Sequence, residues 1–312
     1  MIKERQVSMP FGQRTAFLLV FGIVSAVFAL GSLGTVAWIN AQLRGFEPAP
    51  PATAADYVNY SILGSDGQTA DYIRPESLAA MTAYTEANPE PQGVQILEGM
   101  TTAEISVYMV SQMSGGLKVD CTYCHILTNG NFAEEGNPQK DRARQMMLMS
   151  ADLNQNFLTQ LPASVGNQQI TCATCHNGQP VFNPYPDEVQ VTQPADFRLP
   201  LDLEYPGGLT VTGRSDRSLE DVALNQYTMY HMNRSLGQGC TFCHNARYFP
   251  SNEIEQKGHA TIMLQMTKHL NDQYLTIMNN RTPSCWQCHQ GARIPPAAAR
   301  EGRVPTVLSS TP

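Results

Sequence analysis

The motif Cys-x-x-Cys-His constrains this chain more than any other feature, because it occurs four times and uses all eight cysteines. It is the attachment signature of c-type haem, in which both thiols form thioethers to the haem vinyl groups and the His ligates the iron. The pattern therefore predicts four covalently bound c-type haems. The predicted attachment residues are Cys121, Cys124, Cys172, Cys175, Cys240, Cys243, Cys285 and Cys288, and the predicted axial histidines are His125, His176, His244 and His289.

Zinc and disulfide bonds are the other common uses of paired cysteines. A zinc ion can join two Cys-x-x-Cys units into one tetrahedral site, and disulfide bonds can pair the thiols. Neither explains a His after every pair. Four haems would act as one shared apolar core, so the surrounding protein can be loop-rich.

Composition also limits the partners. Charged residues make up 15% of the 312-residue chain, and the formal net charge is −7. These values argue against a nucleic-acid partner and provide no basic patch for an anionic membrane surface.

Residues 16–39 carry no charged side chain. A helix of this length would be about 36 Å long at about 1.5 Å per residue, enough to cross a hydrocarbon core of about 30 Å. A cleaved signal peptide would have a shorter apolar region, of about 7 to 15 residues. Because Lys3, Arg5 and Arg14 precede this transmembrane helix, the positive-inside rule places residues 1–15 in the cytoplasm. The haem domain would then lie on the periplasmic side of the inner membrane.

The rest of the chain divides into three predicted segments. Residues 40–55 are rich in proline and predict an extended linker. Residues 56–293 hold every haem motif and are the predicted tetrahaem cytochrome domain. Residues 294–312 have little periodic apolar content, and we expect a C-terminal tail that lies on a surface or is disordered.

The haem domain contains an internal repeat. Cys121-Thr-Tyr-Cys-His matches Cys240-Thr-Phe-Cys-His, and segment 146–154 matches segment 263–271 in its spacing of Met, Leu and Asn. The chain is therefore predicted to duplicate a two-haem unit.

Three candidate helix starts fit this arrangement. Thr101, Ser218 and Asn252 are each followed three residues later by an acidic residue, which is typical of a helix N-cap. We therefore expect a mainly α fold with one helix before each haem motif, in two halves at about 90–180 and 215–293.

The sixth ligand of each iron decides between electron transfer and catalysis at a vacant site. Three histidines lie outside the motifs, whereas the chain has 14 Met. Met109 and Met229 lie 12 and 11 residues before a motif, and Met146 and Met263 lie 26 and 22 residues before one. Because a duplication requires such an alternation, these four are the predicted axial Met ligands.

Three alternatives to these ligands remain. The helical register also allows Met113 and Met149 to ligate. His259 lies four residues before Met263, shares its helix face, and competes for the fourth haem.

Four longer motifs accompany the haem motifs within residues 90–293. They are Val94-Gln-Ile-Leu97, Ala143-Arg144-x-Met146-x-x-Met149, Ser235-Leu-Gly-x-x-Cys240-Thr-Phe-Cys-His-Asn245-Ala246 and Cys288-His-Gln290-Gly291. Together with the two-by-two arrangement of the haem motifs, they resemble the tetrahaem cytochrome c subunit of photosynthetic reaction centres.

The resemblance implies a rod-like, mostly helical electron-transfer subunit, not an enzyme, on the extracytoplasmic face of the reaction-centre core subunits. It implies that the haems re-reduce the photo-oxidised bacteriochlorophyll special pair and take electrons from a soluble donor, a small cytochrome c or a blue-copper protein. Met109, Met146 and Met229 match the family's Met ligands. The haem on Cys240 would lie nearest the special pair, and the haem on Cys121 farthest from it.

The chain departs from the family at two points. Lipid-anchored members carry a modified N-terminal Cys, but no Cys lies outside the haem motifs here. Residues 16–39 would therefore anchor the chain, with light-harvesting helices as further candidate partners. In the family the fourth haem often has a His sixth ligand from a position that is Gln160 here. Met263 matches Met146 in the repeat and is the predicted replacement, with His259 as the alternative.

Two other functions are compatible with four haems. A membrane-anchored cytochrome that passes electrons from quinol or a soluble donor to a periplasmic reductase would use mostly His sixth ligands. A multihaem enzyme that reduces a small oxyanion would need a vacant iron. The supply of Met ligands argues against both.

Overall fold

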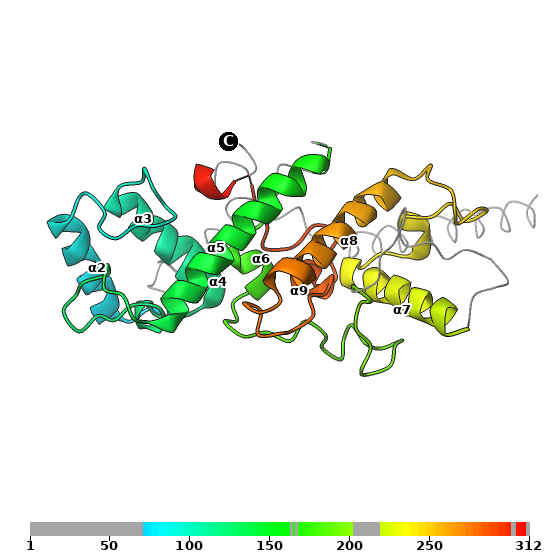
Figure 1. The fold of residues 1–312 in the computed structure, drawn as a ribbon, viewed down its shortest axis with the longest axis horizontal. Coiled ribbons are helices and arrows are strands. Elements are labelled where there is room, and N and C mark those ends of the chain that lie inside the picture. The colour runs from blue at the N-terminus through cyan, green and yellow to red at the C-terminus, as the bar shows by residue number, and fades with distance from the viewer. Residues whose placement is uncertain (1–70, 163–164, 166–167, 202–218, 301–303, 310–312) are drawn as a thin grey trace, which may run out of the picture. The chain divides into compact units, whose positions relative to one another are not determined.

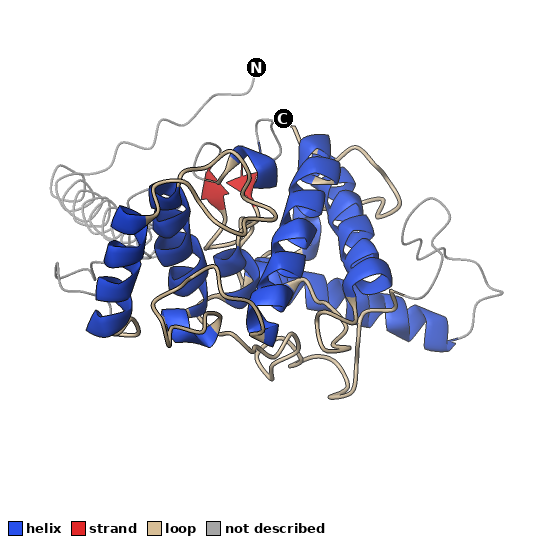
Figure 2. Cartoon of the chain, turned by 60° about the vertical axis from the view of Figure 1, so that its left-hand side comes forward, coloured by secondary structure: helices blue, strands red, loops and turns tan. Residues whose placement is uncertain are grey.

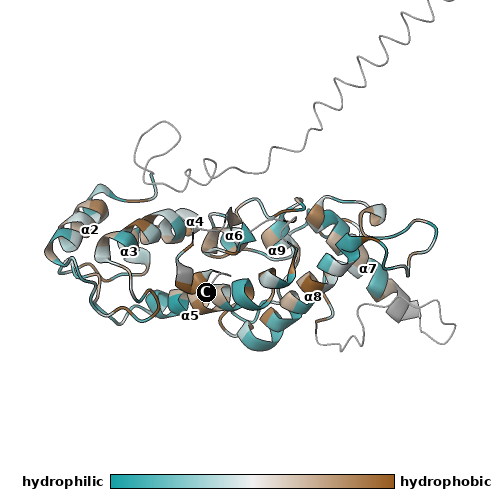
Figure 3. Cartoon of the chain, turned by 90° about the horizontal axis from the view of Figure 1, so that it is seen from above, coloured by the Kyte–Doolittle hydropathy of each residue, from teal (hydrophilic) through white to brown (hydrophobic). Residues whose placement is uncertain are grey.

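A computed structural model of the chain describes residues 71–162, 165, 168–201, 219–300 and 304–309. The chain separates into two units, Met1–Pro51 and Ala52–Pro312, and every described residue lies in the second. The predicted transmembrane helix at 16–39 and the linker at 40–55 lie outside the described residues. Among the helices that are described, none is long and apolar enough to span a membrane, and Figure 3 shows their mixed hydropathy.

The described fold is mainly helical, as predicted (Figure 2). Its longer helices are α2 (Pro75–Ala87), α3 (Thr102–Tyr108), α5 (Pro138–Asn156), α7 (Leu219–Leu236) and α8 (Glu255–Tyr274). Short helices are α4 (Gly115–Leu117), α6 (Cys172–His176) and α9 (Trp286–His289). Two short strands, β1 (Gln168–Gln169) and β2 (Ala299–Arg300), pair in antiparallel register.

A helix precedes each haem motif, which confirms that expectation. Helix α3 begins with the predicted capping box: the Thr101 N–H donates to Glu104 Oε2 at 2.8 Å, and the Glu104 N–H donates to Thr101 Oγ1 at 3.3 Å. Between α3 and α4 the chain forms a π-helical turn, Met109–Ser114, which contains the candidate ligand Met109.

The predicted N-cap at Asn252 is wrong. Helix α8 begins at Glu255, and its N-cap residue is Ile254, which makes no side-chain cap bond. Lys257, in the first turn, instead donates to three carbonyl groups of the preceding loop, so that loop is ordered from within the helix. Ser218, the other candidate N-cap in this half, lies outside the described residues.

The helices that carry the second and fourth motifs pack in the same way. Helix α6 packs on α4, where the Gly178 N–H donates to the Gly116 carbonyl at 2.8 Å. Helix α9 packs on α7, where the Gly291 N–H donates to the Ser235 carbonyl at 2.8 Å. A Cβ atom on Gly237, whose φ is +62°, would lie 2.1 Å from the Gly291 carbonyl oxygen, so this approach requires glycine.

Helices α6 and α9 also pack on each other. Figures 1 and 3 show the resulting order within the described unit: α2 and α3, then α5 with α6, then α8 with α9, then α7. The motifs therefore follow one another in space as first, second, fourth and third. Matching residues of α5 and α8 share one core cluster, which includes Met149, Leu153, Met266 and Leu270.

The C-terminal segment does not lie on the surface, so that expectation is wrong for its described residues. Ala297, Ala298 and Ala299 are buried, and β2 pairs with β1 through Gln168–Arg300 and Gln169–Ala299. Leu308 is 2% exposed, and its carbonyl accepts a 2.7 Å bond from the buried Asn154 side chain of α5. This segment is buried because its side chains are small and its backbone pairs with β1. It has no amphipathic pattern that would have predicted this burial.

Candidate haem-binding sites

Each motif is wound into a single helical turn. The first and third motifs begin with 3-10 turns, Cys121–Tyr123 and Cys240–Phe242, and the second and fourth lie on α6 and α9. Residues three and four apart share one face of such a turn, so the two cysteines and the His of each motif lie on the same side. This is the arrangement needed to hold one planar group by two thioethers and one imidazole.

All four motif histidines are oriented by a backbone carbonyl. The Nδ1 atoms of His125, His176, His244 and His289 lie 3.0, 3.0, 2.9 and 3.0 Å from the carbonyl oxygens of Phe132, Gln179, Phe249 and Ala292. Because a carbonyl can only accept, Nδ1 carries the proton and Nε2 keeps its lone pair. That tautomer is the one a metal-ligating His uses when its second nitrogen is fixed by a neighbouring group.

Burial disfavours the charged forms of three of these rings and of two neighbouring thiols. It lowers the pKa of His125 to about 4, helped by the positive charge of Lys140, and it also lowers the pKa of His176 and His289. Burial raises the pKa of Cys172 and Cys285 to about 12. A neutral imidazole is the ligating form, and an uncharged thioether sulfur suits the same apolar surroundings.

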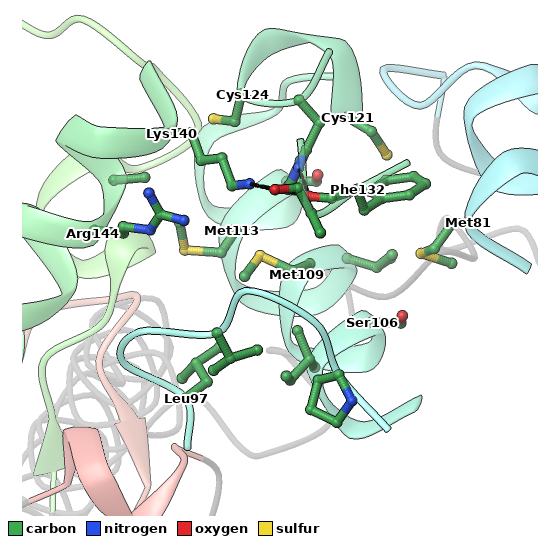
Figure 4. Close-up of a pocket in the computed structure, with 18 of the residues that line it drawn as sticks. Met81, Leu97, Ser106, Met109, Met113, Cys121, Cys124, Phe132, Lys140 and Arg144 are labelled. Carbon is green, nitrogen blue, oxygen red and sulfur yellow. Dashed lines mark hydrogen bonds between the residues drawn. The ribbon is translucent and has the colours of Figure 1, made fainter. Parts of the chain in front are cut away.

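The first cavity encloses about 1180 Å³ of space free of protein atoms, its open mouth included. It is lined by Cys121, Cys124 and His125 together with Met109 and Met113 of the π-helical turn. Figure 4 shows both Met side chains reaching into this cavity below the two cysteines. The predicted ligand Met109 is therefore brought to its motif.

Met113 and Met149 remain candidates next to the predicted ligands. Met113 Sδ accepts a contact from Cys172 Sγ at 3.2 Å, so Met113 lies between the first and second motifs. The second cavity, of about 1130 Å³, is lined by Cys172, Cys175 and His176, and both Met146 and Met149 line it.

The third cavity, of about 1910 Å³, is larger and is shared between two motifs. It is lined by Cys243 of the third motif and by Cys285, Cys288 and His289 of the fourth, with Met263 of α8 beside them. His259 lines the same cavity, and its Nε2 lies 3.5 Å from the Glu255 carboxylate. Lining alone therefore does not choose between Met263 and His259.

Met229 is not among the residues that line these three cavities. It lies on α7, before the third motif, where Cys240 is exposed. Residues 202–218, which precede α7, are outside the described part of the chain. The assignment of Met229 therefore stays a prediction.

The other two histidines outside the motifs have structural partners. His231 is fully buried, and its Nε2 accepts a 3.2 Å bond from the Cys285 backbone N–H. His269 Nε2 lies 2.6 Å from Asp152 Oδ2 and joins α8 to α5. Gln160, at the family's His position, is exposed and donates to the Asn156 carbonyl at 2.5 Å.

The second and fourth motifs meet at their cysteines. Cys175 Sγ lies 3.2 Å from Cys288 Sγ, and no disulfide bond joins any of the eight cysteines. Within the described residues no three His, Cys, Asp or Glu side chains converge on a metal position.

Sequence reasoning missed the residues whose carbonyls orient the histidines. Phe132 and Phe249 each precede a lysine by eight residues, Lys140 and Lys257. A comparison of the two halves for that spacing could have found them.

Paired thiols beside a neutral, Nε2-presenting His in apolar cavities define a c-type cytochrome. The sequence model of the photosynthetic reaction centre cytochrome C subunit matches residues 53–198 and 213–283. The chain belongs to this family.

Similarity to individual curated proteins supports this family assignment. The chain is 27% identical to cytochrome c-554 of Chloroflexus aurantiacus, over 83% of this chain and 81% of the relative. It is 26% identical to the photosynthetic reaction center cytochrome c subunit of Thermochromatium tepidum, over 82% and 74%. It is 27% identical to the photosynthetic reaction center cytochrome c subunit of Rubrivivax gelatinosus, over 67% of this chain and 68% of the relative.

Family membership fixes the general role. The protein carries covalently bound haem c and is an electron-transfer protein, not an enzyme. It serves a photosynthetic reaction centre, whose core is its partner, and it is associated with the membrane in that complex.

Proposed function

We propose that this protein carries four c-type haems, one on each motif, and uses them to re-reduce the photo-oxidised special pair. The observation that carries the proposal is that the Nδ1 atom of all four motif histidines lies within hydrogen-bond distance of a backbone carbonyl oxygen. A motif that had lost its haem would not need a fixed tautomer. Bound haem supplies one-electron chemistry at iron, and the chain sets the order and ligation of the groups.

The proposed axial partners are Met109, Met146, Met229 and Met263, opposite the motif histidines. Three of them line a cavity together with residues of their motif, which supports this set. Met113 contacts Cys172 of the neighbouring motif, and Met149 is itself a buried member of the core shared by α5 and α8, which favours packing roles for both. Met146 and Met263 are only partly buried beside that core.

The proposed electron path follows the spatial order of the motifs. Contacts of α4 with α6, of α6 with α9 and of α9 with α7 support a path from the first motif to the second, fourth and third. The approach of Cys175 to Cys288 supports direct transfer between the second and fourth haems. We also propose that the tetrahaem domain, 56–293, consists of a duplicated two-haem unit. The matching packing of its two halves supports this.

The third motif is the proposed end for the reaction-centre core. Tyr248 and Phe249, in the loop after this motif, are 64% and 49% exposed. In the loop after the first motif, Phe132 instead packs against Tyr84 of α2, with ring centroids 5.5 Å apart. Exposed aromatic side chains are typical of a protein interface, so they support docking at the third motif.

The remaining elements of the proposal concern the membrane and the donor. Residues 16–39 would anchor the chain as a single transmembrane helix, with residues 1–15 in the cytoplasm and the haem domain in the periplasm. The soluble donor, a small cytochrome c or a blue-copper protein, would dock near the first motif. Light-harvesting helices are candidate neighbours of the anchor.

The test is flash spectroscopy on the purified reaction-centre complex that contains this chain. We expect a pyridine haemochrome assay to give four haems per chain and a light flash to oxidise the haem band as the special pair recovers. An intact complex whose haem band does not respond to the flash would contradict the proposed role.

A further inference from the structure

Two loops of the protein are each held by one lysine from the next helix. Lys140 of α5 donates to the carbonyl oxygens of Phe132, Ala133 and Glu134 at 3.2, 3.2 and 2.9 Å. Lys257 of α8 donates to the carbonyl oxygens of Phe249, Pro250 and Ser251 at 3.2, 2.9 and 2.9 Å. These loops follow the first and third haem motifs, so the same device occurs at matching places in the two halves.

In both loops the lysine shares an acceptor with the motif His. The Phe132 carbonyl also accepts from His125 Nδ1 at 3.0 Å, and the Phe249 carbonyl accepts from His244 Nδ1 at 2.9 Å. Each Phe ring lies against its His ring, with centroids 5.1 and 5.0 Å apart. Figure 4 shows the Lys140 side chain directed at the backbone of Phe132 beside the cavity.

The second and fourth motifs lack this lysine. Their histidines donate to the carbonyls of Gln179 and Ala292, at 3.0 Å in both cases. In the described part of the chain no lysine donates to either carbonyl. The stem of Lys118 lies against Gly178 beside the second motif, but its ammonium group makes no such bond. The lysine bond to the carbonyl shared with the His therefore distinguishes the first and third motifs from the other two.

We propose that Lys140 and Lys257 are positioning residues for the axial histidines of the first and third haems, and that their charge raises the reduction potentials of those two haems. The inference rests on haem attachment at these motifs, as proposed above. A fixed positive charge beside the axial imidazole disfavours the additional positive charge of ferric iron. The ammonium group also competes for the shared carbonyl, which weakens the bond that makes the imidazole a stronger donor. Both effects favour the reduced haem.

The surroundings of the two lysines differ. Lys140 Nζ lies 3.0 Å from Glu135 Oε1, and Arg144 bonds the same carboxylate at 2.6 Å and Asp141 at 3.0 Å. For Lys257 no carboxylate lies within ion-pair distance among the described residues. Because its charge is not offset by an ion pair, Lys257 should raise the potential of its haem more than Lys140 does.

The test is a redox titration of the full-length haem-loaded protein carrying Lys140→Met or Lys257→Met, which keep the apolar stem and remove the charge. Each variant should lower one of the four midpoint potentials. The reduction equilibrium of that haem should weaken by on the order of tenfold, which is 59 mV for a one-electron couple, and more for Lys257→Met than for Lys140→Met. Lys257→Arg, which keeps the charge, should leave the midpoint potential of that haem close to its wild-type value.

Lys268→Met is the matched control. Lys268 is also on α8 and donates to a backbone carbonyl, that of Leu201 at 2.9 Å, but no motif His shares this acceptor. Four unchanged potentials in haem-replete Lys140→Met and Lys257→Met would overturn the proposal, and so would an equal fall in the control. If a Met variant loses haem, Lys→Gln at the same position, which keeps a donor without the charge, is titrated by the same criteria. A wild-type protein without haem would instead refute the proposed function.

Discussion

At the scale of single residues, two side chains of α8 are candidates for the sixth ligand of the proposed fourth haem. Met263 and His259 are one helical turn apart and line the same cavity. His259 has a neighbouring carboxylate, Glu255, at 3.5 Å, whereas the Met263 thioether is packed against the core cluster of α5 and α8. The Glu255 carboxylate faces Nε2 of His259, a nitrogen that would have to bind the iron, so ligation by His259 would have to break this contact.

We therefore expect Met263→Leu to abolish one Met-to-iron charge-transfer band and to lower one midpoint potential. The fall should be on the order of 100 mV, a small part of the roughly 0.8 V that axial ligands can span. Near-infrared absorption and redox titration measure these effects. His259→Gln is the control and should leave both unchanged; the opposite pattern would assign the ligand to His259.

At the scale of elements, α5 and α8 are joined by a hydrogen-bonded carboxylate at the edge of their shared core. Asp152 of α5 accepts from Tyr274 at 2.7 Å and from Asn156 at 2.6 Å, and its Oδ2 lies 2.6 Å from His269 Nε2. Burial alone would raise the pKa of Asp152, but the bonds from His269, Tyr274 and Asn156 outweigh it and hold the pKa below its usual value. The ionised carboxylate therefore stabilises the fold.

We expect Asp152→Asn to lower the free energy of unfolding by about 1 kcal/mol at neutral pH, since the site is partly exposed. Because the folded-state pKa is depressed, the contribution is present above the ordinary value of 3.8 and is lost as the pH falls through the lowered value. The difference between wild type and variant should thus narrow as the pH falls below about 5. Denaturant titrations at several pH values measure this. The control is Asp272→Asn, which breaks only the exposed ion pair with Lys268 on α8 and should lower the free energy of unfolding by less than about 0.5 kcal/mol. If both variants lowered this free energy equally at neutral pH, the stabilising role of Asp152 would be contradicted.

At the scale of elements, some features of the fold could be predicted from the sequence and others could not. The haem motifs, the helices before them and the capping box at Thr101 follow from short-range patterns, and the structure has them. The N-cap residue of helix α2, Arg74, makes no capping side-chain bond, so the short-range signals for this helix are Pro75 at its first position and Glu76 in its first turn. The C-terminal segment is held by backbone pairing and by the amide of Asn154, which leave no apolar period to read. Lys140 and Lys257 bind carbonyl groups, which every residue has, so only their spacing could reveal them.

At the scale of the whole molecule, the loops after the first and third haem motifs differ in how far other elements shield them from solvent. Helix α2 covers the loop after the first motif, but among the described residues no element covers Tyr248 and Phe249 in the same way. Under the proposed function, this asymmetry would let the two halves bind different partners, one at each end of the proposed electron path.

We expect Tyr248→Ser to weaken binding to the reaction-centre core by about tenfold, or about 1.4 kcal/mol, because Tyr is enriched among the few interface residues that carry most of the binding energy. The haem content and the midpoint potentials should not change. Reconstitution of the core with purified cytochrome, followed by a binding titration, measures this. Val107→Ser is the control, since Val107 of α3 is 67% exposed near the first motif and should not matter. Equal weakening by both variants would place the docking surface elsewhere.

The pairing of β2 with β1 has a consequence for biogenesis. Gln168 and Gln169, in the first half of the chain, pair with Arg300 and Ala299, and Asn154 donates to the Leu308 carbonyl, 154 positions away. If the haem domain is exported from its N-terminal side, as the proposed topology implies, these contacts of the first half can form only after residues 299–308 have crossed the membrane. In that order of events, haem could be attached to the second motif before the C-terminal segment packs against Thr171 and Thr174.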